Sequence, residues 1–377
     1  MIYLDNGATT AVCDAAVQKM VAAMTQQFGN PSSLHRLGIE AERELTEARK
    51  AVAALVGADA AQITFTSGGT EANNLAILGA ATALSRSSRK AVTTAVEHSS
   101  VAACFDELEK QGWQVTRVLP ESDGSLSPQA IAAACESDTA LVSAMTVNNE
   151  TGAWLDIAET VKAVKRRAPK AVFHTDSVQA AGKLPLKAER WGVDLMTVSS
   201  HKLHGPKGAG ALYIRRGTRV LPRQIGGGQE KGLRSGTESV PALVGFGAAA
   251  RAIEPFSVQQ QRFEALRAAL LDALADLPDV RWHLPKNGVP YIVNLSVMGL
   301  RSETVLHFLA ERDIFVSGGS ACAKGKHSRV LTAMGLPEPE VDAALRVSFC
   351  RENTVDEVRA FAAALREAAN TLQRRSL

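Results

Sequence analysis

Two polar side chains follow strand-like runs closely and could form a chemical site together. Lys202 comes after the run Asp194–Ser199, where a surface lysine would be unusual. A lysine in a dry pocket has a lowered pKa and can form a Schiff base with a carbonyl group. Asp176 comes after the run Ala171–His174 and could pair with a pyridinium nitrogen. These residue types indicate carbonyl chemistry with a pyridine cofactor.

A glycine-rich turn offers the anion site that such a cofactor needs. Ser67-Gly68-Gly69-Thr70 separates a strand-like run from a helix-like one. Glycines let the backbone approach closely, and the free N–H groups and dipole of a helix start favour a phosphate. The turn lacks both the Gly-Lys-Ser/Thr of a nucleotide loop and a G-x-G-x-x-G motif, and alone it fits an ordinary turn equally well. Together with Lys202 and Asp176 it indicates pyridoxal 5′-phosphate (PLP).

One of the five cysteines stands in a setting that suits a reactive thiol. Cys322 lies among glycines, with Lys324 and Lys326 just after it, and nearby positive charge raises the ionised fraction of a thiol. No two cysteines lie within four residues, so paired zinc-ligand spacing is absent and no metal is expected. The alternative is a small buried core residue, a role that suits three other cysteines better: Cys104, Cys135 and Cys350.

Strand-like and helix-like runs alternate between about residues 45 and 215, which predicts an α/β fold with a mostly parallel sheet covered on both faces. The expected strands are Ile63–Thr66, Ala91–Val96, Val115–Val118, Ala140–Val147, Ala171–His174, Asp194–Ser199 and Gly210–Ile214. The expected helices are Glu71–Ala83, Ser100–Gln111, Pro128–Glu136 and Ala158–Arg167. Ligands bind beyond the carboxyl ends of such strands, so the polar residues that follow the strands should meet at one edge.

The last third of the chain has a different pattern. The elements expected there are a helix at Val258–Ala275, strands near 291–297 and 314–317, and a last helix at Val355–Arg374. We therefore predict two domains, as the length of 377 residues also suggests. The large PLP-binding domain would span residues 13–254. A smaller α+β domain would combine residues 1–12 with residues 255–377 and carry the Cys322 loop.

The composition argues against several classes of function. Lys+Arg number 42 against 39 Asp+Glu, a net charge of +3 without long runs of either sign, so direct nucleic-acid binding is not expected. The start MIYLDNGATT lacks the basic and apolar stretches of a signal peptide, and no apolar run is long enough for a membrane span. We therefore expect a cytoplasmic protein with reduced thiols.

Motifs along essentially the whole chain resemble those of the cysteine desulfurases, in the class V branch of the PLP-dependent transferases (fold type I, aspartate aminotransferase-like). The matching segments are YLDNGATT (3–10), FGNPSSLHRLG (28–38), TSGGTEANN (66–74), EHSS (97–100), NNETG (148–152), TDSVQAAGK (175–183), SSHKLHGPKG (199–208), RSGTES (234–239), GSAC (319–322) and RVSF (346–349). They set the chain apart from nucleotide enzymes, and the GSAC cysteine sets it apart from most sister aminotransferases.

The resemblance implies a role for each matching residue. Lys202 would bind PLP as a Schiff base, Asp176 would keep the pyridine nitrogen protonated, and His98 would stack on the ring and move protons. Gln179 would bond the phenolic oxygen of the ring. The phosphate would be held by Gly69, Thr70, Ser199 and His201, and by Thr237 from the other subunit of a homodimer. The substrate carboxylate would be held by Asn149 and Arg346, with Arg351 as the alternative to Arg346.

The resemblance assigns the sulfur step to Cys322. Its thiolate would attack the sulfur of L-cysteine, giving L-alanine and a persulfide for transfer to an acceptor protein. The acceptor could be an iron–sulfur scaffold or a tRNA-thiolation enzyme. The loop AKGKHSRVL after Cys322 is shorter than in the iron–sulfur-assembly members, and the chain ends soon after its last helix, so the sequence does not choose between them.

Two other functions remain open at this point. Another class V reaction, such as selenocysteine lysis, cysteine-sulfinate lysis or β-elimination, would need Lys202 and Asp176 but would depend less on Cys322. A non-catalytic scaffold for a sulfur-transfer partner would be marked by loss of the lysine or the aspartate. Both residues are present, which disfavours the scaffold.

Overall fold

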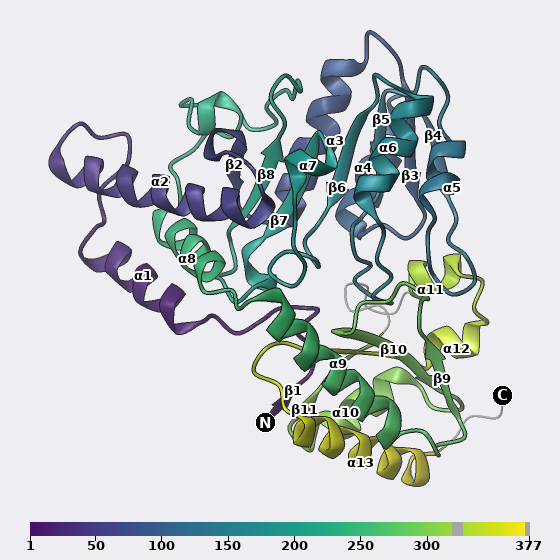
Figure 1. Ribbon diagram of the computed structural model, residues 1–377. Helices are drawn as coiled ribbons and strands as arrows, with labels where there is room; N and C mark the ends of the chain where they lie inside the picture. Colours follow the sequence, from purple (N-terminus) through teal and green to yellow (C-terminus); the bar gives the residue numbers. More distant parts are fainter. Residues whose placement is uncertain (319–326, 374–377) are drawn as a thin grey trace.

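The computed structural model describes residues 1–318 and 327–373. It contains a seven-stranded sheet and a four-stranded sheet, each covered by helices (Figure 1). A two-stranded sheet pairs the N-terminal strand with a strand from the last third of the chain. The predicted fold class, a large mostly parallel sheet with a smaller α+β part, is therefore confirmed.

The seven-stranded sheet has the strand order β2-β8-β7-β6-β5-β3-β4. All of its strands run in one direction except β8, which is antiparallel to both of its neighbours. The strands are β2 (Ile63–Thr66), β3 (Lys90–Thr94), β4 (Gln114–Val118), β5 (Leu141–Ser143), β6 (Val172–Asp176), β7 (Leu195–Ser199) and β8 (Gly210–Ile214). All seven predicted strands are thus confirmed, with some ends shifted by a few residues.

Side chains along these strands point alternately to the two faces of the sheet, so each face packs against its own set of helices. Leu141 and Leu195 belong to a buried cluster with α3 (Gly69–Leu84) and α4 (Ser99–Lys110). Their neighbours Val142 and Met196 point to the opposite face and join a second, larger cluster. The helices on that face are α2 (Arg36–Val56), α5 (Pro128–Ala133), α6 (Ile157–Arg167), α7 (Ala188–Trp191) and α8 (Val240–Arg251).

Two N-terminal helices, α1 (Asp14–Thr25) and α2, precede the region in which the sequence predicts alternation, and both pack against α8 (Figure 1). A Cβ atom on Gly247 of α8 would lie 2.5 Å from the Cα of Ala48 in α2. The two helices can approach this closely only because residue 247 has no side chain. This contact holds α8, and the loop that leads into it, against the N-terminal region.

The four-stranded sheet is antiparallel, with the order β12-β13-β10-β9. Its strands are β9 (Val280–His283), β10 (Ile292–Val297), β12 (Ser317–Gly318) and β13 (Ala344–Ser348). The helices of this region are α9 (Phe256–Ala273), α10 (Ser302–Ala310), α11 (Arg329–Ala333), α12 (Glu338–Asp342) and α13 (Val355–Thr371). The sequence pattern predicts β10, the extended segment near residues 314–317 and the two long helices, but it misses β9 and β13.

The first residues of the chain belong with its last third. β1 (Ile2–Tyr3) pairs in parallel with β11 (Ile314–Phe315), and Asp5 forms a bridge with Ser348 at the end of β13. The grouping of the N-terminus with the C-terminal region agrees with the prediction, whereas a domain boundary near residue 255 stays a prediction. In the part of the chain that the structure describes, no helix combines the length and apolar character of a membrane span.

Candidate active site

A cavity of about 340 Å³ lies beyond the carboxyl ends of the parallel strands. Its wall includes residues from the turns after β2, β3, β6 and β7, and from β13 of the smaller sheet. Ten of the predicted site residues line this one cavity: Gly69, Thr70, His98, Asn149, Asp176, Gln179, Ser199, His201, Lys202 and Arg346. The convergence expected from the strand ends is therefore present, although the role of each residue stays a prediction.

Lys202 lies just after β7, in the short 3₁₀ turn Ser200–Lys202. Its Nζ donates hydrogen bonds to the backbone oxygens of Gly7 (2.5 Å) and Ala8 (2.7 Å). A Cβ on Gly7 would lie 3.1 Å from Cζ of Arg346, so a glycine lets the N-terminal segment pass between these two cations. This contact could not be expected from a motif, because its acceptors are backbone oxygens, which every residue has.

Asp176 is the last residue of β6 and is 4% exposed. Its Oδ2 accepts a hydrogen bond from Nδ2 of Asn73 (2.7 Å), and its Oδ1 accepts one from the backbone N–H of Val178 (3.0 Å). Both carboxylate oxygens therefore have a hydrogen-bond donor that fixes their position. A buried carboxylate held in this way is suited to stabilise a positive charge in the cavity, such as a protonated pyridine nitrogen.

His98 forms the N-cap of α4 and faces Ser100 with one side of its ring. The backbone N–H of Ser100 donates to Nδ1 (3.2 Å), and the Ser100 hydroxyl lies 2.8 Å from the same nitrogen. Burial lowers the pKa of His98, and the charge of Asp176 opposes this only in part. The ring is therefore neutral near pH 7, with its proton on Nε2.

The expected phosphate site surrounds the start of α3. Gly210 of β8 lies so close that a Cβ there would be 2.6 Å from the carbonyl carbon of Gly68. The hydroxyl of Ser199 is buried without a partner, and Nδ1 of His201 lies 3.2 Å from Oγ1 of Thr9. Burial and the positive charge of Lys202 lower the pKa of His201 to about 4, so this ring is neutral near pH 7. A helix start with an unpaired hydroxyl suits an anion.

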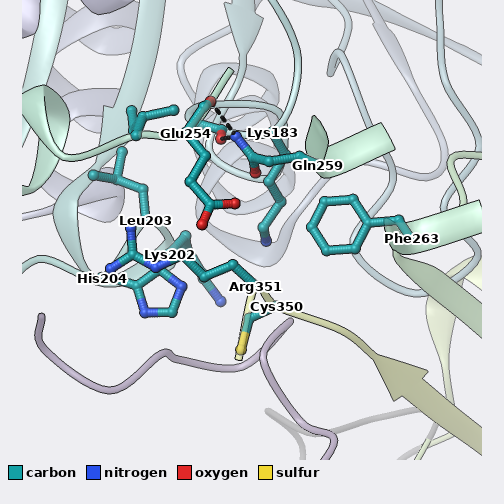
Figure 2. Close-up of a pocket in the computed structure, with 11 residues that line it drawn as sticks. Lys183, Lys202, Leu203, His204, Glu254, Gln259, Phe263, Cys350 and Arg351 are labelled. Carbon is teal, nitrogen blue, oxygen red and sulfur yellow. Dashed lines mark hydrogen bonds between the residues drawn. The ribbon is translucent and has the colours of Figure 1, made fainter. Parts of the chain in front are cut away.

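The two candidate arginines lie in different places. Arg346 on β13 is 4% exposed and donates from Nη1 to the backbone oxygen of Asn149 (2.8 Å) and from Nη2 to Asp5 (2.7 Å). Arg351 does not line the large cavity but a separate one of about 20 Å³, shown with Lys183 and Cys350 in Figure 2. That space is enough for one water molecule and too small for an amino acid. The geometry therefore favours Arg346.

The small cavity also borders a group of potential metal ligands. His204, Cys350 and Glu352 place donor atoms within 4.8 Å of one another. However, Nε of Arg351 donates to Glu352 (2.9 Å), and the thiol of Cys350 also donates to Glu352 (3.0 Å). Protein partners thus already satisfy the carboxylate, and the guanidinium of Arg351 repels a cation. This cluster does not suggest a metal centre.

Six polar atoms of residues that line the large cavity are buried without a hydrogen-bond partner: Oδ1 of Asn73, Oε2 of Glu97, Oδ1 of Asn149, Oε1 of Gln179, Oγ of Ser199 and Nε of Arg346. Buried polar groups are nearly always paired in folded proteins. A polar ligand bound in this cavity would supply the missing hydrogen-bond partners of these atoms. With the helix start, the carboxylate of Asp176 and the amine of Lys202, they fit PLP and an amino acid.

Two acids in the cavity wall were not among the predicted site residues. Burial raises the pKa of Glu97 to about 8, even though Thr94 and the backbone N–H of Met145 both donate to its Oε1. Burial also raises the pKa of Glu150 to about 7, and this acid accepts a hydrogen bond from Ser328. Glu97 follows the predicted strand Ala91–Val96, and Glu150 lies three residues after the predicted strand Ala140–Val147, so their position near strand ends was the available signal.

Two predicted residues are not placed in the cavity. Cys322 lies outside the described residues. Thr237 is exposed and does not line the cavity. Its loop is attached to the large sheet by an ion pair from Arg234 to Glu71 at the start of α3 (2.8 Å).

Comparisons with known proteins cover nearly the whole chain. Residues 2–361 match the family model of the class-V aminotransferases. The chain is 41% identical over 373 residues to a NifS/IcsS protein homolog of Lactobacillus delbrueckii subsp. bulgaricus, with 97% of each chain covered. It is 41% identical over 368 residues to a cysteine desulfurase of a Nostoc species, covering 95% of this chain and 90% of the relative. A solved NifS-like protein matches 98% of this chain and 100% of its own with a TM-score of 0.93 at 34% identity.

Proposed function

The chain belongs to the class-V aminotransferase family and, within it, to the cysteine desulfurases, and we propose how its cavity residues carry out that reaction. The enzyme uses PLP to take sulfur from L-cysteine. PLP, when bound, withdraws electrons from the substrate and so weakens the bond between its carbon and sulfur atoms. The tasks left to the protein are to hold the cofactor, orient the amino acid, move protons and receive the sulfur.

Lys202 and Asp176 hold the two ends of the reactive ring system. The amine of Lys202 would hold the cofactor through its aldehyde, and the backbone oxygens of Gly7 and Ala8 support this assignment because they already orient Nζ. The carboxylate of Asp176 stabilises the proton on the ring nitrogen, where its burial strengthens the attraction. The start of α3 at Gly69 and Thr70, with Ser199 and His201, binds the phosphate.

His98 acts as the proton carrier. A histidine that is neutral near pH 7 can take up a proton during the reaction and return it, and its Nε2–H can donate a hydrogen bond to the substrate. Its ring is held by the two contacts from Ser100, which fixes its orientation relative to the cavity. The amine of Lys202 is a second group in the cavity that would be able to move protons.

Arg346 and Asn149 select an amino acid by its carboxylate. Arg346 has an unpaired Nε, and its other nitrogens bond Asn149 and Asp5, which hold the guanidinium still. A planar guanidinium pairs with a carboxylate through two parallel hydrogen bonds. Substrate binding therefore requires a modest rearrangement in which the carboxylate takes over donors now shared with Asp5.

Cys322 receives the sulfur. Its thiolate attacks the sulfur of the bound cysteine, so that a sulfur–sulfur bond forms while the carbon–sulfur bond breaks. The electron pair of the broken bond stays with the carbon, which then takes up a proton to give L-alanine. The persulfide is passed on to an acceptor protein, such as an iron–sulfur scaffold or a tRNA-thiolation enzyme. This chemistry needs reduced thiols and suits the cytoplasm.

The working form is a homodimer in which Thr237 completes the phosphate site of the partner. Val17, Val21 and Met24 form an apolar stripe on α1 that is 45–53% exposed. A stripe of this kind often marks an association surface. α1 packs on α8, which begins three residues after Thr237, so the stripe and the Thr237 loop belong to neighbouring parts of the structure.

The observation that carries this proposal is the meeting of Lys202, Asp176, His98 and Arg346 around one cavity. We expect the pure protein to release alanine and sulfide from L-cysteine in the presence of a thiol reductant. Lys202→Ala should abolish both products, and it should lose the absorption band of the lysine–cofactor Schiff base or hold PLP only as an external adduct. Lys207→Ala is the matched control, because this lysine is exposed in the same loop. Equal activity of Lys202→Ala and Lys207→Ala would refute the assignment.

A further inference from the structure

The ring of His98 has a defined tautomer because of its contacts with Ser100. A backbone N–H can only donate, so the 3.2 Å bond from the Ser100 N–H makes Nδ1 of His98 an acceptor. The hydroxyl of Ser100, 2.8 Å from the same nitrogen, must then donate as well. The single proton of the neutral ring is therefore on Nε2.

The same Ser100 hydroxyl connects to Asp176 through Asn73, which is 1% exposed. Nδ2 of Asn73 donates one hydrogen to the Ser100 hydroxyl (2.9 Å) and the other to Oδ2 of Asp176 (2.7 Å). A carboxylate accepts and does not donate, so the amide nitrogen and not its oxygen must face Asp176. Oδ1 of Asn73 is left buried without a partner. A buried oxygen without a partner destabilises the folded protein. Asn73 nevertheless keeps this orientation, because both of its amide hydrogens form bonds.

We propose that Asn73 and Ser100 are positioning residues that couple the charge of Asp176 to the tautomer of His98. This inference rests on the proposed function, since it concerns the residues assigned there to the ring nitrogen and to proton transfer. The order of donation is fixed along the chain: Asn73 donates to both Asp176 and Ser100, and Ser100 donates to His98. Hydrogen bonds in such a series strengthen one another.

The coupling gives the cavity a consistent set of protonation states. The Asp176 carboxylate holds the amide of Asn73 in one orientation, and that orientation leaves the Ser100 hydrogen free for Nδ1 of His98. Loss of either bridging side chain releases this constraint and allows a proton on Nδ1. The bonds that start at the Asp176 carboxylate thus keep the N–H of His98 at Nε2.

The link can be measured without the cofactor and without activity. In cofactor-free protein labelled with ¹⁵N-histidine, nitrogen chemical shifts separate protonated from unprotonated ring nitrogens, and His98→Gln identifies the signals. We expect an unprotonated Nδ1 in the original protein. Ser100→Ala should raise the Nδ1-protonated fraction about fivefold, since one neutral hydrogen bond is lost. Asn73→Leu should shift the tautomer the same way. Ser99→Ala, which removes a neighbouring exposed hydroxyl, should leave it unchanged.

The second measurement is PLP affinity, followed by the fluorescence change on binding. Asn73→Leu removes a charge-assisted bond to Asp176 and should weaken binding about tenfold, whereas Ser100→Ala should change it less than about twofold. If Asn73→Leu does not fold, Asn73→Asp keeps the volume, loses the donors and should lower affinity further, because two carboxylates must share a proton. An unchanged His98 tautomer in the Asn73 variants would overturn the coupling even if affinity fell. Absence of desulfurase activity in the original protein would instead refute the proposed function alone.

Discussion

A buried ion pair fastens the loop that carries Thr237 to the large sheet. The side chain of Glu230 is 3% exposed and that of Arg49 is 18% exposed. Two nitrogens of Arg49 donate to the two carboxylate oxygens at 2.6 and 2.7 Å. The backbone N–H of Phe65 also donates to Glu230 (2.9 Å), and the guanidinium lies over the Phe65 ring, 4.5 Å from its centroid. Glu230→Gln keeps the size of the side chain and removes its charge.

The loss in the free energy of unfolding depends on which contacts of Arg49 remain in the variant. Removal of one partner of a buried ion pair destabilises a protein by about 3–5 kcal/mol. Arg49 keeps its stacking on Phe65 and its bond to the oxygen of Ile63 (3.1 Å), and the glutamine oxygen can still accept from Phe65. We therefore expect the free energy of unfolding to fall by about 2–3 kcal/mol. A double variant, Arg49→Met with Glu230→Gln, should lose no more than this, because no buried charge remains.

The assay is urea denaturation of the cofactor-free protein, followed by tryptophan fluorescence and by circular dichroism. Cofactor-free protein is used because a bound ligand adds stability of its own, and coincidence of the two signals tests for a single transition. Glu40→Gln is the control: its pair with Arg36 is exposed (40% and 82%), so its loss should not be measurable. A loss below about 1 kcal/mol in Glu230→Gln, or a clearly less stable double variant, would refute the reasoning.

Four further predictions concern the chemistry and the assembly. Cys322→Ser should retain PLP and its absorbance change on adding L-cysteine but lose sulfide release by orders of magnitude, because a hydroxyl is a poor nucleophile toward sulfur; turnover equal to the original protein would indicate a lyase. Burial raises the pKa of Glu97 from 4.5 to about 8, so unfolding releases a proton between these values and the free energy of unfolding should decline as pH rises from about 4.5 to about 8. Glu97→Gln should flatten that decline in urea titrations, and an unchanged slope would contradict the shift. Light scattering should find a dimer, and Thr237→Ala should weaken phosphate and PLP binding; a fully active monomer would contradict the shared site. The double variant Lys324→Glu with Lys326→Glu should slow persulfide transfer to an acceptor with an acidic rim more than it slows sulfide release to a small thiol. The difference between the two rates should be larger at low salt. Equal losses in both rates would mean that the lysines act on Cys322 itself.

The parts of the site that follow strands could be predicted from the sequence. Lys202, Asp176 and His98 each lie within three residues of the end of a strand-like run, and the rule that strand ends meet at one edge of a sheet brings them together. Arg346 is different, because β13 is a five-residue strand whose pattern did not stand out, and only the family resemblance pointed to it. The strands of the large sheet were predictable because helix-like segments separate their apolar runs in a regular alternation.

The contacts that complete the site could not be predicted, because they depend on tertiary packing. The carbonyls of Gly7 and Ala8 reach Lys202 across 195 and 194 residues of sequence. A backbone oxygen has the same chemistry at every position, so no residue type marks it. Asn73 and Ser100 lie within recognised motifs, but their connection to each other requires α3 and α4 to be packed side by side, and a motif does not contain that information.

The N-terminal segment has a consequence for how the protein is made. Asn6 bonds to Asn353, 347 residues later, and Gly7, which orients Lys202, is itself held by Ser348. A ribosome adds about 5–20 residues per second, so roughly 20–70 seconds pass between the synthesis of these two ends. During that time the large sheet can form while the amine of Lys202 lacks the carbonyls that orient it. We expect nascent chains that stop before β13 to be open to proteases at their first residues, and to capture PLP only once synthesis is complete.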